Sequence, residues 1–223
     1  MAIKNYLIGI GGTGARVIEA VVHLCAAGLG PSELSMFMVD PDSGNGNLDR
    51  TKKLITAYKN IRAKLQKTED CPLFRTDIKI PPDEKKFVWE IFENTNATLS
   101  EFINFENLKS TDPNLSDFAS LLFTADELTT KLNEGFRGHP SIGSVVMSNP
   151  PQDKYPFKML WDEMNDKKPN DIRVFIVGSV FGGTGAAGFP TLGSKHLIKY
   201  NMSAKVGDAE SKVLLGGALV LPY

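Results

Sequence analysis

Two glycine-rich turns carry the residue types that bind phosphate. The first, residues 9–14, reads GIGGTG after an apolar segment at 4–10, and the second, residues 182–185, reads GGTG after the β-branched run 173–177. A strand that ends in a glycine turn and then starts a helix presents backbone N–H groups and the positive end of the helix dipole. Glycine suits such a turn because a Cβ atom would keep phosphate oxygens from the amides and would disfavour positive φ. One turn alone is weak evidence, but two such turns predict a site for a polyphosphate chain.

The first turn also fits the dinucleotide fingerprint G-x-G-x-x-G, as Gly9, Gly11 and Gly14. In that fingerprint an acid after the next strand binds a ribose hydroxyl, and Asp40 stands at a suitable place. An NAD-type oxidoreductase domain is therefore an alternative. The second glycine turn favours a nucleoside triphosphate with magnesium, since a dinucleotide does not need a second turn and a triphosphate has more charge to neutralise.

Composition is that of a soluble globular protein. The chain has 223 residues, 42% hydrophobic and 23% charged, with a formal net charge of -1. This length suits one α/β domain with a substantial core. The balanced charge gives no reason to expect nucleic acid or an anionic membrane as a partner. The two cysteines, Cys25 and Cys71, lack the spacing of a metal or redox motif, and we expect Cys25 to be a packed thiol.

Neither a signal peptide nor a membrane span is expected from the sequence. Lys4 and Asn5 lead into a short strand and a glycine turn, without a small-residue cleavage site. No apolar run approaches the roughly 20 residues that span a bilayer. We therefore predict a cytoplasmic protein.

The chain alternates strand-like and helical segments, which is typical of βαβ units with right-handed crossovers. Helical spacing predominates from 83 to about 133. We predict one α/β domain over residues 1–223, a three-layer Rossmann-like sheet of mainly parallel strands with helices on both faces and a helical insertion at about 83–133. Strands are expected at 4–10, 36–39, 74–80, 173–177 and 213–221, and helical segments at 15–27, 48–65, 141–147, 158–168 and 191–199.

Large hydrophobic side chains recur through the predicted insertion. They could line a groove for a partner, but buried helix faces are the simpler interpretation, and we predict burial. The residues are Phe87, Val88, Trp89, Ile91, Phe92, Leu99, Phe102, Ile103, Phe118, Leu121, Leu122 and Phe123.

Several motifs in order resemble the tubulin/FtsZ superfamily. DIRVFIVGSVFGGTGAAGFP resembles the tubulin signature, GGGTGTG followed by a proline, with Phe181, Ala186 and Ala187 as departures. GIGGTGARVIEA is similar to the family's first phosphate loop, MFMVDPD to its second, GFRGHPSIG to its third, and VLLGGALVLPY to the strand after the signature. The resemblance covers residues 3–42 and 135–223, whereas 43–134 matches the family poorly.

The resemblance implies a tubulin/FtsZ-type nucleotide-binding domain for GTP or GDP with Mg²⁺. Asp42 would approach the water shell of the magnesium ion, and Gly138 and His139 would lie at the γ-phosphate loop. Arg137 could pair with the γ-phosphate or be an ordinary surface arginine. Arg16 stands where family members carry an asparagine near the base. The full set of predicted nucleotide-binding residues is Gly11, Gly12, Thr13, Gly14, Arg16, Asp40, Asp42, Arg137, Gly138, His139, Gly182, Gly183, Thr184 and Gly185.

Family members polymerise head to tail, and the resemblance implies a polymer-forming GTPase of the cytoskeletal type. In that family the water-activating acids come from a neighbouring subunit, from a loop after a long central helix that this chain does not reach. We expect the C-terminal activation domain to be absent from this chain and hydrolysis by the fragment alone to be slow. No catalytic residue is assigned. A third hypothesis is a scaffold that reads nucleotide without turnover and uses 83–133 as an interaction surface.

Overall fold

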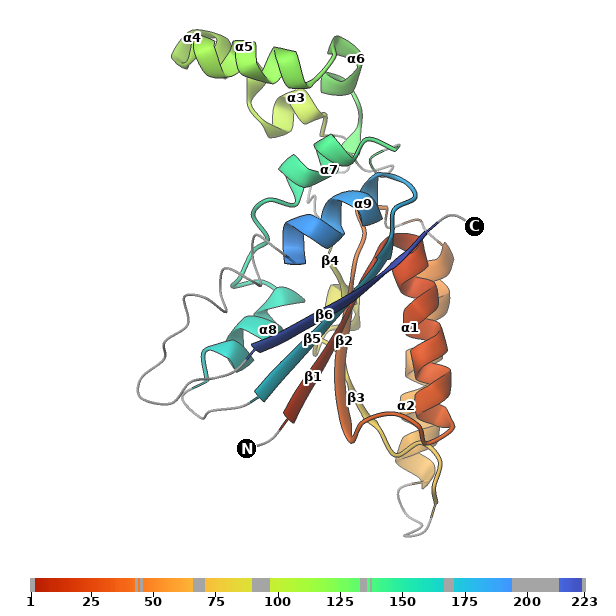
Figure 1. The fold of residues 1–223 in the computed structure, drawn as a ribbon. Helices are drawn as coiled ribbons and strands as arrows, with labels where there is room; N and C mark the ends of the chain where they lie inside the picture. The colour runs from red at the N-terminus through yellow and green to blue at the C-terminus, as the bar shows by residue number, and fades with distance from the viewer. Residues whose placement is uncertain are drawn as a thin grey trace.

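A parallel β-sheet forms the centre of the molecule (Figure 1). The computed structural model describes residues 3–42, 44, 46–65, 71–89, 97–132, 136, 138–166, 171–193 and 213–221. Within these ranges the sheet has six strands, all paired in parallel: β1 (Ile3–Ile10), β2 (Glu33–Val39), β3 (Asp77–Lys79), β4 (Val88–Trp89), β5 (Asp171–Ser179) and β6 (Val213–Val220). The predicted α/β class with a mainly parallel sheet is confirmed, and the fold is compatible with a Rossmann-like arrangement.

The strand order reverses beside β1. The order is β3-β2-β1-β5-β6, and β4 also pairs with β2, along the last part of that strand. The chain therefore builds from β1 outward through β2 and then returns to place β5 on the other side of β1. Ile8 is the register partner of both Phe37 in β2 and Ile176 in β5. The carboxyl ends of β1 and β5 consequently lie side by side at one edge of the sheet.

Helices cover both faces of this sheet (Figure 1). Helix α1 (Gly11–Ala26) packs on one face and against α2 (Gly46–Leu65). The opposite face carries α8 (Phe157–Met164) and α9 (Gly183–Pro190). The Tyr6 hydroxyl of β1 donates a 3.0 Å hydrogen bond to the carbonyl of Met159, and the ring of Phe37 meets that of Phe157 with 5.2 Å between centroids. These two contacts hold α8 against β1 and β2.

Four short helices stand beyond the carboxyl edge of the sheet (Figure 1). They are α3 (Leu99–Phe102), α4 (Phe105–Thr111), α5 (Pro113–Leu122) and α6 (Ala125–Leu128), and α7 (Pro140–Val146) lies between them and α9. Side-chain caps define several starts: Thr98 and Thr124 form capping boxes, and the Asp112 carboxylate accepts from the amide of Leu115. We call α3 to α6 the helical unit.

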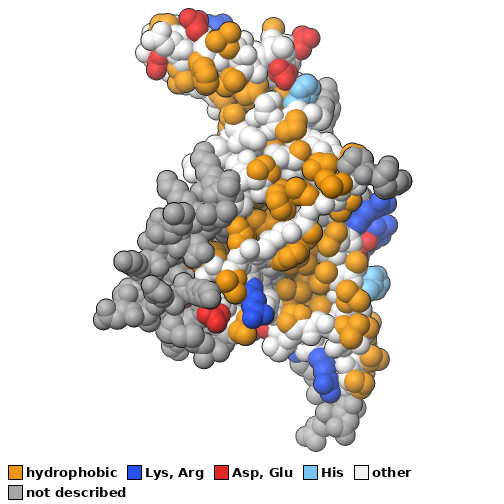
Figure 2. All heavy atoms as spheres, in the orientation of Figure 1, with side chains coloured by type: hydrophobic (Ala, Val, Ile, Leu, Met, Phe, Trp, Pro, Cys, Tyr) orange, Lys and Arg blue, Asp and Glu red, His pale blue; other side chains and the backbone are white. Residues whose placement is uncertain are grey.

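Two predictions for the 83–133 segment were wrong. Its first part is a 3₁₀ turn, η1 (Glu84–Phe87), followed by strand β4, because Val88 and Trp89 extend the sheet beside Met38 and Val39. Burial was also predicted too widely. Leu99 and Phe123 are buried, but Phe102, Phe118, Leu121 and Leu122 are exposed, since the helical unit projects from the sheet; Figure 2 shows hydrophobic side chains on its visible face. Ile91 and Phe92 lie outside the described residues.

Several boundaries differ from those predicted. Helix α1 begins at Gly11 rather than 15, so the glycine turn forms the first turn of the helix. Strand β2 begins at Glu33, whose carboxylate forms ion pairs with Lys4 of β1 and Lys79 of β3 at the amino edge of the sheet. Of the predicted helix 191–199, residues 194–199 fall outside the described ranges. Among the described helices, none combines the length and apolar character needed to cross a membrane.

Candidate functional site

The two glycine turns meet at the carboxyl edge of the sheet. A Cβ atom added to Gly11 would lie 3.7 Å from Cβ of Thr184 and 3.8 Å from the backbone nitrogen of Gly185. The hydroxyl of Thr13 donates a 3.3 Å hydrogen bond to that of Ser179, the last residue of β5. Residues from opposite ends of the chain thus form one junction, at the point where the strand order reverses. Open α/β sheets bind ligands in the crevice at such a point.

Two helices start at this junction without side-chain caps. The N-cap position is occupied by Ile10 in α1 and by Gly182 in α9. At neither position does a side chain accept a hydrogen bond from the first turn of the helix. Neither helix has an acidic residue in its first turn. The N-terminal amides and the positive ends of both dipoles therefore remain suited to an external anion. Two helix starts at one junction attract a polyphosphate more strongly than one.

Three of the glycines have a packing requirement. A Cβ on Gly14 would lie 2.6 Å from the carbonyl carbon of Gly9, and one on Gly185 would overlap the carbonyl oxygen of Ser179. Gly14 and Gly185 therefore let α1 and α9 start directly against the strand ends. A Cβ on Gly183 would lie 2.5 Å from Cβ of Phe136. These contacts account for the three glycines without any ligand.

Gly11 and Gly182 differ from the glycines required for packing. Their φ angles are +68° and +74°, a backbone region that disfavours side chains. A Cβ on Gly182 would meet no heavy atom of the described structure within 4 Å. Gly12 is partly buried beside them. Conformation, rather than crowding, accounts for glycine at these two positions.

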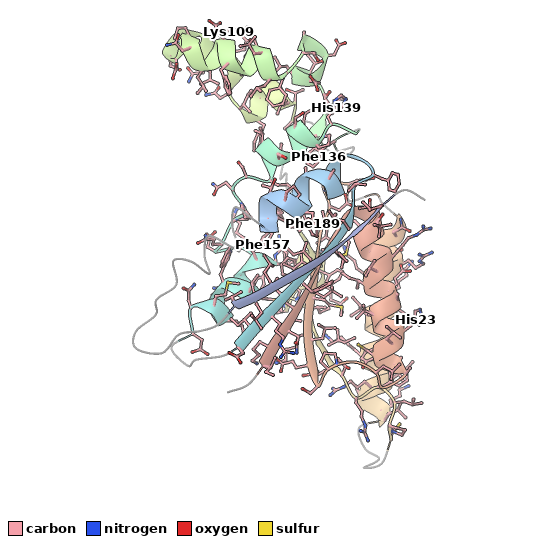
Figure 3. The ribbon with its side chains drawn as sticks, viewed as in Figure 1. His23, Lys109, Phe136, His139, Phe157 and Phe189 are labelled. Carbon is pink, nitrogen blue, oxygen red and sulfur yellow. The ribbon has the colours of Figure 1, made fainter. Side chains whose placement is uncertain are left out.

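The third predicted loop adjoins the second through Phe136, whose side chain is buried against Gly183. The His139 ring instead pairs with α6, with 2.9 Å between its Nδ1 and Oε1 of Glu127 (Figure 3 labels both Phe136 and His139). The pKa of Glu127 is lowered, chiefly by the hydrogen bond from the backbone of Thr124 and further by His139. Gly138 has φ +82° and is exposed, and Arg137 lies outside the described residues. A phosphate contact by His139 that keeps this pair would have to use Nε2.

The two acids after β2 shape their own turn. Oδ1 of the buried Asp40 accepts a 3.0 Å hydrogen bond from the backbone amide of Asp42. Oδ1 of Asp42 accepts a 3.0 Å hydrogen bond from the backbone amide of Gly44. Across the described residues there is no group of three or more His, Cys, Asp or Glu that could hold a metal ion. Mg²⁺ is commonly bound by one or two carboxylates together with substrate phosphates. This donor set therefore fits Mg²⁺ as part of a nucleotide complex and not as an independent protein site.

Arg16 lies on the exposed side of α1. Its charge contributes to the lowered pKa of Glu19, after the larger effect of the hydrogen bond from Arg50. Arg50 and Thr51 of α2 both donate to the Glu19 carboxylate, which joins the two helices. No contact places Arg16 at the junction of the turns.

Sequence reasoning missed Ser179 and Phe136. Ser179 ends β5, accepts from Thr13 and donates to the carbonyl of Phe181 at 3.2 Å, so it links the two turns. Its signal was available, because a hydroxyl residue ends the apolar strand three positions before Gly182. Phe136 had no local signal, since only the folded chain brings it against Gly183 and Gly143.

No family model matches the sequence, and neither the curated proteins nor the solved structures include a match. The function of the chain is therefore inferred from the geometry of the junction and from the motif resemblance.

Proposed function

We propose that this domain binds a guanine nucleotide, GTP or GDP with Mg²⁺, at the junction of the two glycine turns. The proximity of Gly11 to Thr184 and Gly185, where the strand order reverses, is the observation that carries this proposal. The uncapped starts of α1 and α9 support it, because both direct backbone amides toward the carboxyl edge. Guanine as the base comes from the motif resemblance alone.

In this proposal the backbone does most of the binding. Amides of the turns at 11–14 and 183–185 donate to phosphate oxygens, and the hydroxyls of Thr13 and Thr184 add donors. A bound Mg²⁺ would neutralise phosphate charge, with Asp42 as the carboxylate that the motif resemblance assigns to its water shell. Phosphoryl transfer depends mainly on positioning and charge stabilisation. The chain's own contribution is accordingly to hold and orient the polyphosphate.

The proposal extends to a tubulin/FtsZ-like, polymer-forming GTPase. Asp40 and Asp42 are the acids of the predicted site, and both accept amides of their own turn. The proposal assigns water activation to neither, because the resemblance places the water-activating acids on a neighbouring subunit. In the family that the motifs resemble, a neighbouring subunit supplies the water-activating acids, so isolated domains should hydrolyse nucleotide slowly.

A dinucleotide such as NAD is the second candidate. Gly14 allows the close approach of α1 to β1 that the dinucleotide fingerprint requires. Asp40 directly follows β2, where the fingerprint has the acid that binds a ribose hydroxyl. The α9 turn favours the first candidate, because it adds amides that a dinucleotide pyrophosphate does not need. A non-hydrolysing scaffold is the third; the exposed Phe118 and Leu121 of α5 favour it.

Calorimetric titration separates the candidates. The domain is titrated with GTP, GDP, ATP and NAD, each with and without Mg²⁺. Saturable binding of GTP and GDP that is tighter than that of NAD supports the proposal. Binding of NAD alone would replace it with the dinucleotide candidate, and no binding of any nucleotide would refute both.

A further inference from the structure

A cavity lies apart from the glycine turns. It has a volume of about 690 Å³ and is enclosed by η1 and β4, the end of α3, the second half of α7 and the chain from 148 to 158. None of its lining residues belongs to the two glycine turns. Small-molecule sites typically occupy about 300–1,000 Å³, so this volume suits a ligand of that class.

The floor of the cavity is apolar and aromatic. Val88 and Trp89 of β4 and Val146 of α7 line it, and each is at least 94% buried. The Trp89 ring is fixed edge-on against Phe157, with 5.0 Å between centroids. Phe102, 43% exposed, adds a second aromatic wall. A rigid aromatic surface with a neighbouring open ring favours a flat aromatic ligand.

The rim of the cavity is positively charged. Four lysines line it, Lys85, Lys86, Lys154 and Lys158, against a single carboxylate, Asp153. This excess is local, because the whole chain has a net charge of -1. Ammonium groups at the mouth of an apolar cavity attract anions and hold them there.

The lysines are available to different degrees. Lys158 also pairs with Asp162, at 3.0 Å, and Lys154 has an interaction of its own, whereas Lys85 and Lys86 are exposed. Over the described ranges, no ion pair joins Lys85 or Lys86 to a carboxylate. These two ammonium groups are adjacent in sequence at the start of the apolar floor. An anion bound there would displace no carboxylate of the described residues.

We propose that this cavity binds a flat aromatic anion, with its ring on the Trp89 floor and its carboxylate or phosphate among the lysines. Neither feature alone selects this class: the floor would accept any apolar ring, and the rim any anion. The floor and the rim together favour a molecule that carries both an aromatic ring and a negative charge. The proposal does not depend on nucleotide binding at the glycine turns.

Titration of the whole chain with 2-naphthyl phosphate tests the proposal, with binding followed by calorimetry and by tryptophan fluorescence. The matched ligands are 2-naphthol, which lacks the charge, and inorganic phosphate, which lacks the ring. We expect naphthyl phosphate to bind at least about tenfold more tightly than either. Equal binding of naphthol, or no saturable binding of naphthyl phosphate, would overturn the proposal.

Charge reversal on the rim locates the site. The triple variant Lys85→Glu, Lys86→Glu, Lys154→Glu should raise the Kd for naphthyl phosphate by about tenfold or more. Its control reverses three exposed lysines of α2, Lys53→Glu, Lys59→Glu and Lys64→Glu, and should leave the Kd within about twofold.

Two further outcomes decide the location. Phe102→Ala removes an exposed ring and should weaken binding even if the triple variant loses its fold, with the melting temperature of each variant as the check. A Kd unchanged in Phe102→Ala and in a folded triple variant would overturn the proposal. Displacement of naphthyl phosphate by inorganic triphosphate, with equal loss in both charge-reversal variants, would assign it to the glycine turns instead.

Discussion

Replacing Gly11 by alanine separates the conformational role of this residue from its place in the proposed site. The φ angle is +68°, and an L-residue in that region costs about 1–2 kcal/mol. The nearest heavy atoms to the added methyl, in Thr184 and Gly185, lie at 3.7 and 3.8 Å, which is ordinary contact. No steric cost should add to the strain. A domain of this size loses about 2–4 °C per kcal/mol, so the melting temperature should fall by about 2–8 °C.

The same methyl should interfere with a ligand. It stands between the two turns, where the proposal places phosphate oxygens against the amides. At a hundred times the Kd, a ligand stabilises the wild-type protein by about 2.7 kcal/mol, which raises its melting temperature by roughly 5–11 °C. In Gly11→Ala, most of this increase should disappear. Differential scanning calorimetry with and without GDP and Mg²⁺ measures both effects.

A stability-matched variant controls for the strain. Ile55, 1% exposed in α2, can be replaced by valine at a cost of about 0.5–1.5 kcal/mol without entering the junction. Ile55→Val should lose comparable stability and keep the full increase with GDP. If GDP stabilises Gly11→Ala as strongly as wild type, no polyphosphate lies between the turns. A stability loss well above 2 kcal/mol would refute the assumption that the methyl meets no clash.

Three further predictions concern packing, pH and turnover. Gly143→Ala places a methyl 2.7 Å from the ring of Phe136 and should cost about 1–3 kcal/mol in urea unfolding; an unchanged midpoint would contradict the packing described. The pKa of Glu33 is set by burial, which raises it, and by hydrogen bonds from Lys79 and Lys4, which outweigh burial and lower it below the ordinary 4.5. The carboxylate therefore stabilises the fold fully above pH 4.5 and loses this effect as the pH falls through its folded pKa. Glu33→Gln should lose about 1 kcal/mol at pH 7 and approach wild type near pH 2, and a loss independent of pH would be inconsistent with this origin. Nucleotide hydrolysis by this chain should be slow at every protein concentration, because the proposal assigns water activation to none of its residues; fast turnover would show that no second subunit is needed.

Local patterns predicted the centre of the fold. The apolar runs of β1 and β5 and the glycines that follow them carry their own signal, because strand, turn and helix start are all encoded within about 20 residues. The parallel pairing of the two strands then brings the turns together at one edge. The sequence therefore predicted that the two turns meet, as Gly11 and Gly185 do.

Tertiary contacts decided what the sequence patterns missed. Val88 and Trp89 have helix-compatible spacing, but the free end of β2 provides a pairing partner and makes them a strand. Phe118 and Leu121 repeat like a buried helix face, although α5 offers that face to solvent. His139 sits in a motif that resembles a phosphate loop, yet the fold brings Glu127 to its ring.

The central claim is that both glycine turns hold one polyphosphate, and amide chemical shifts test it most directly. In a ¹⁵N-labelled sample titrated with GDP and Mg²⁺, the amides of Gly11, Gly12, Gly183 and Gly185 should shift together and fit a single Kd. Shifts confined to one turn, or two turns responding with different Kd values, would contradict the account.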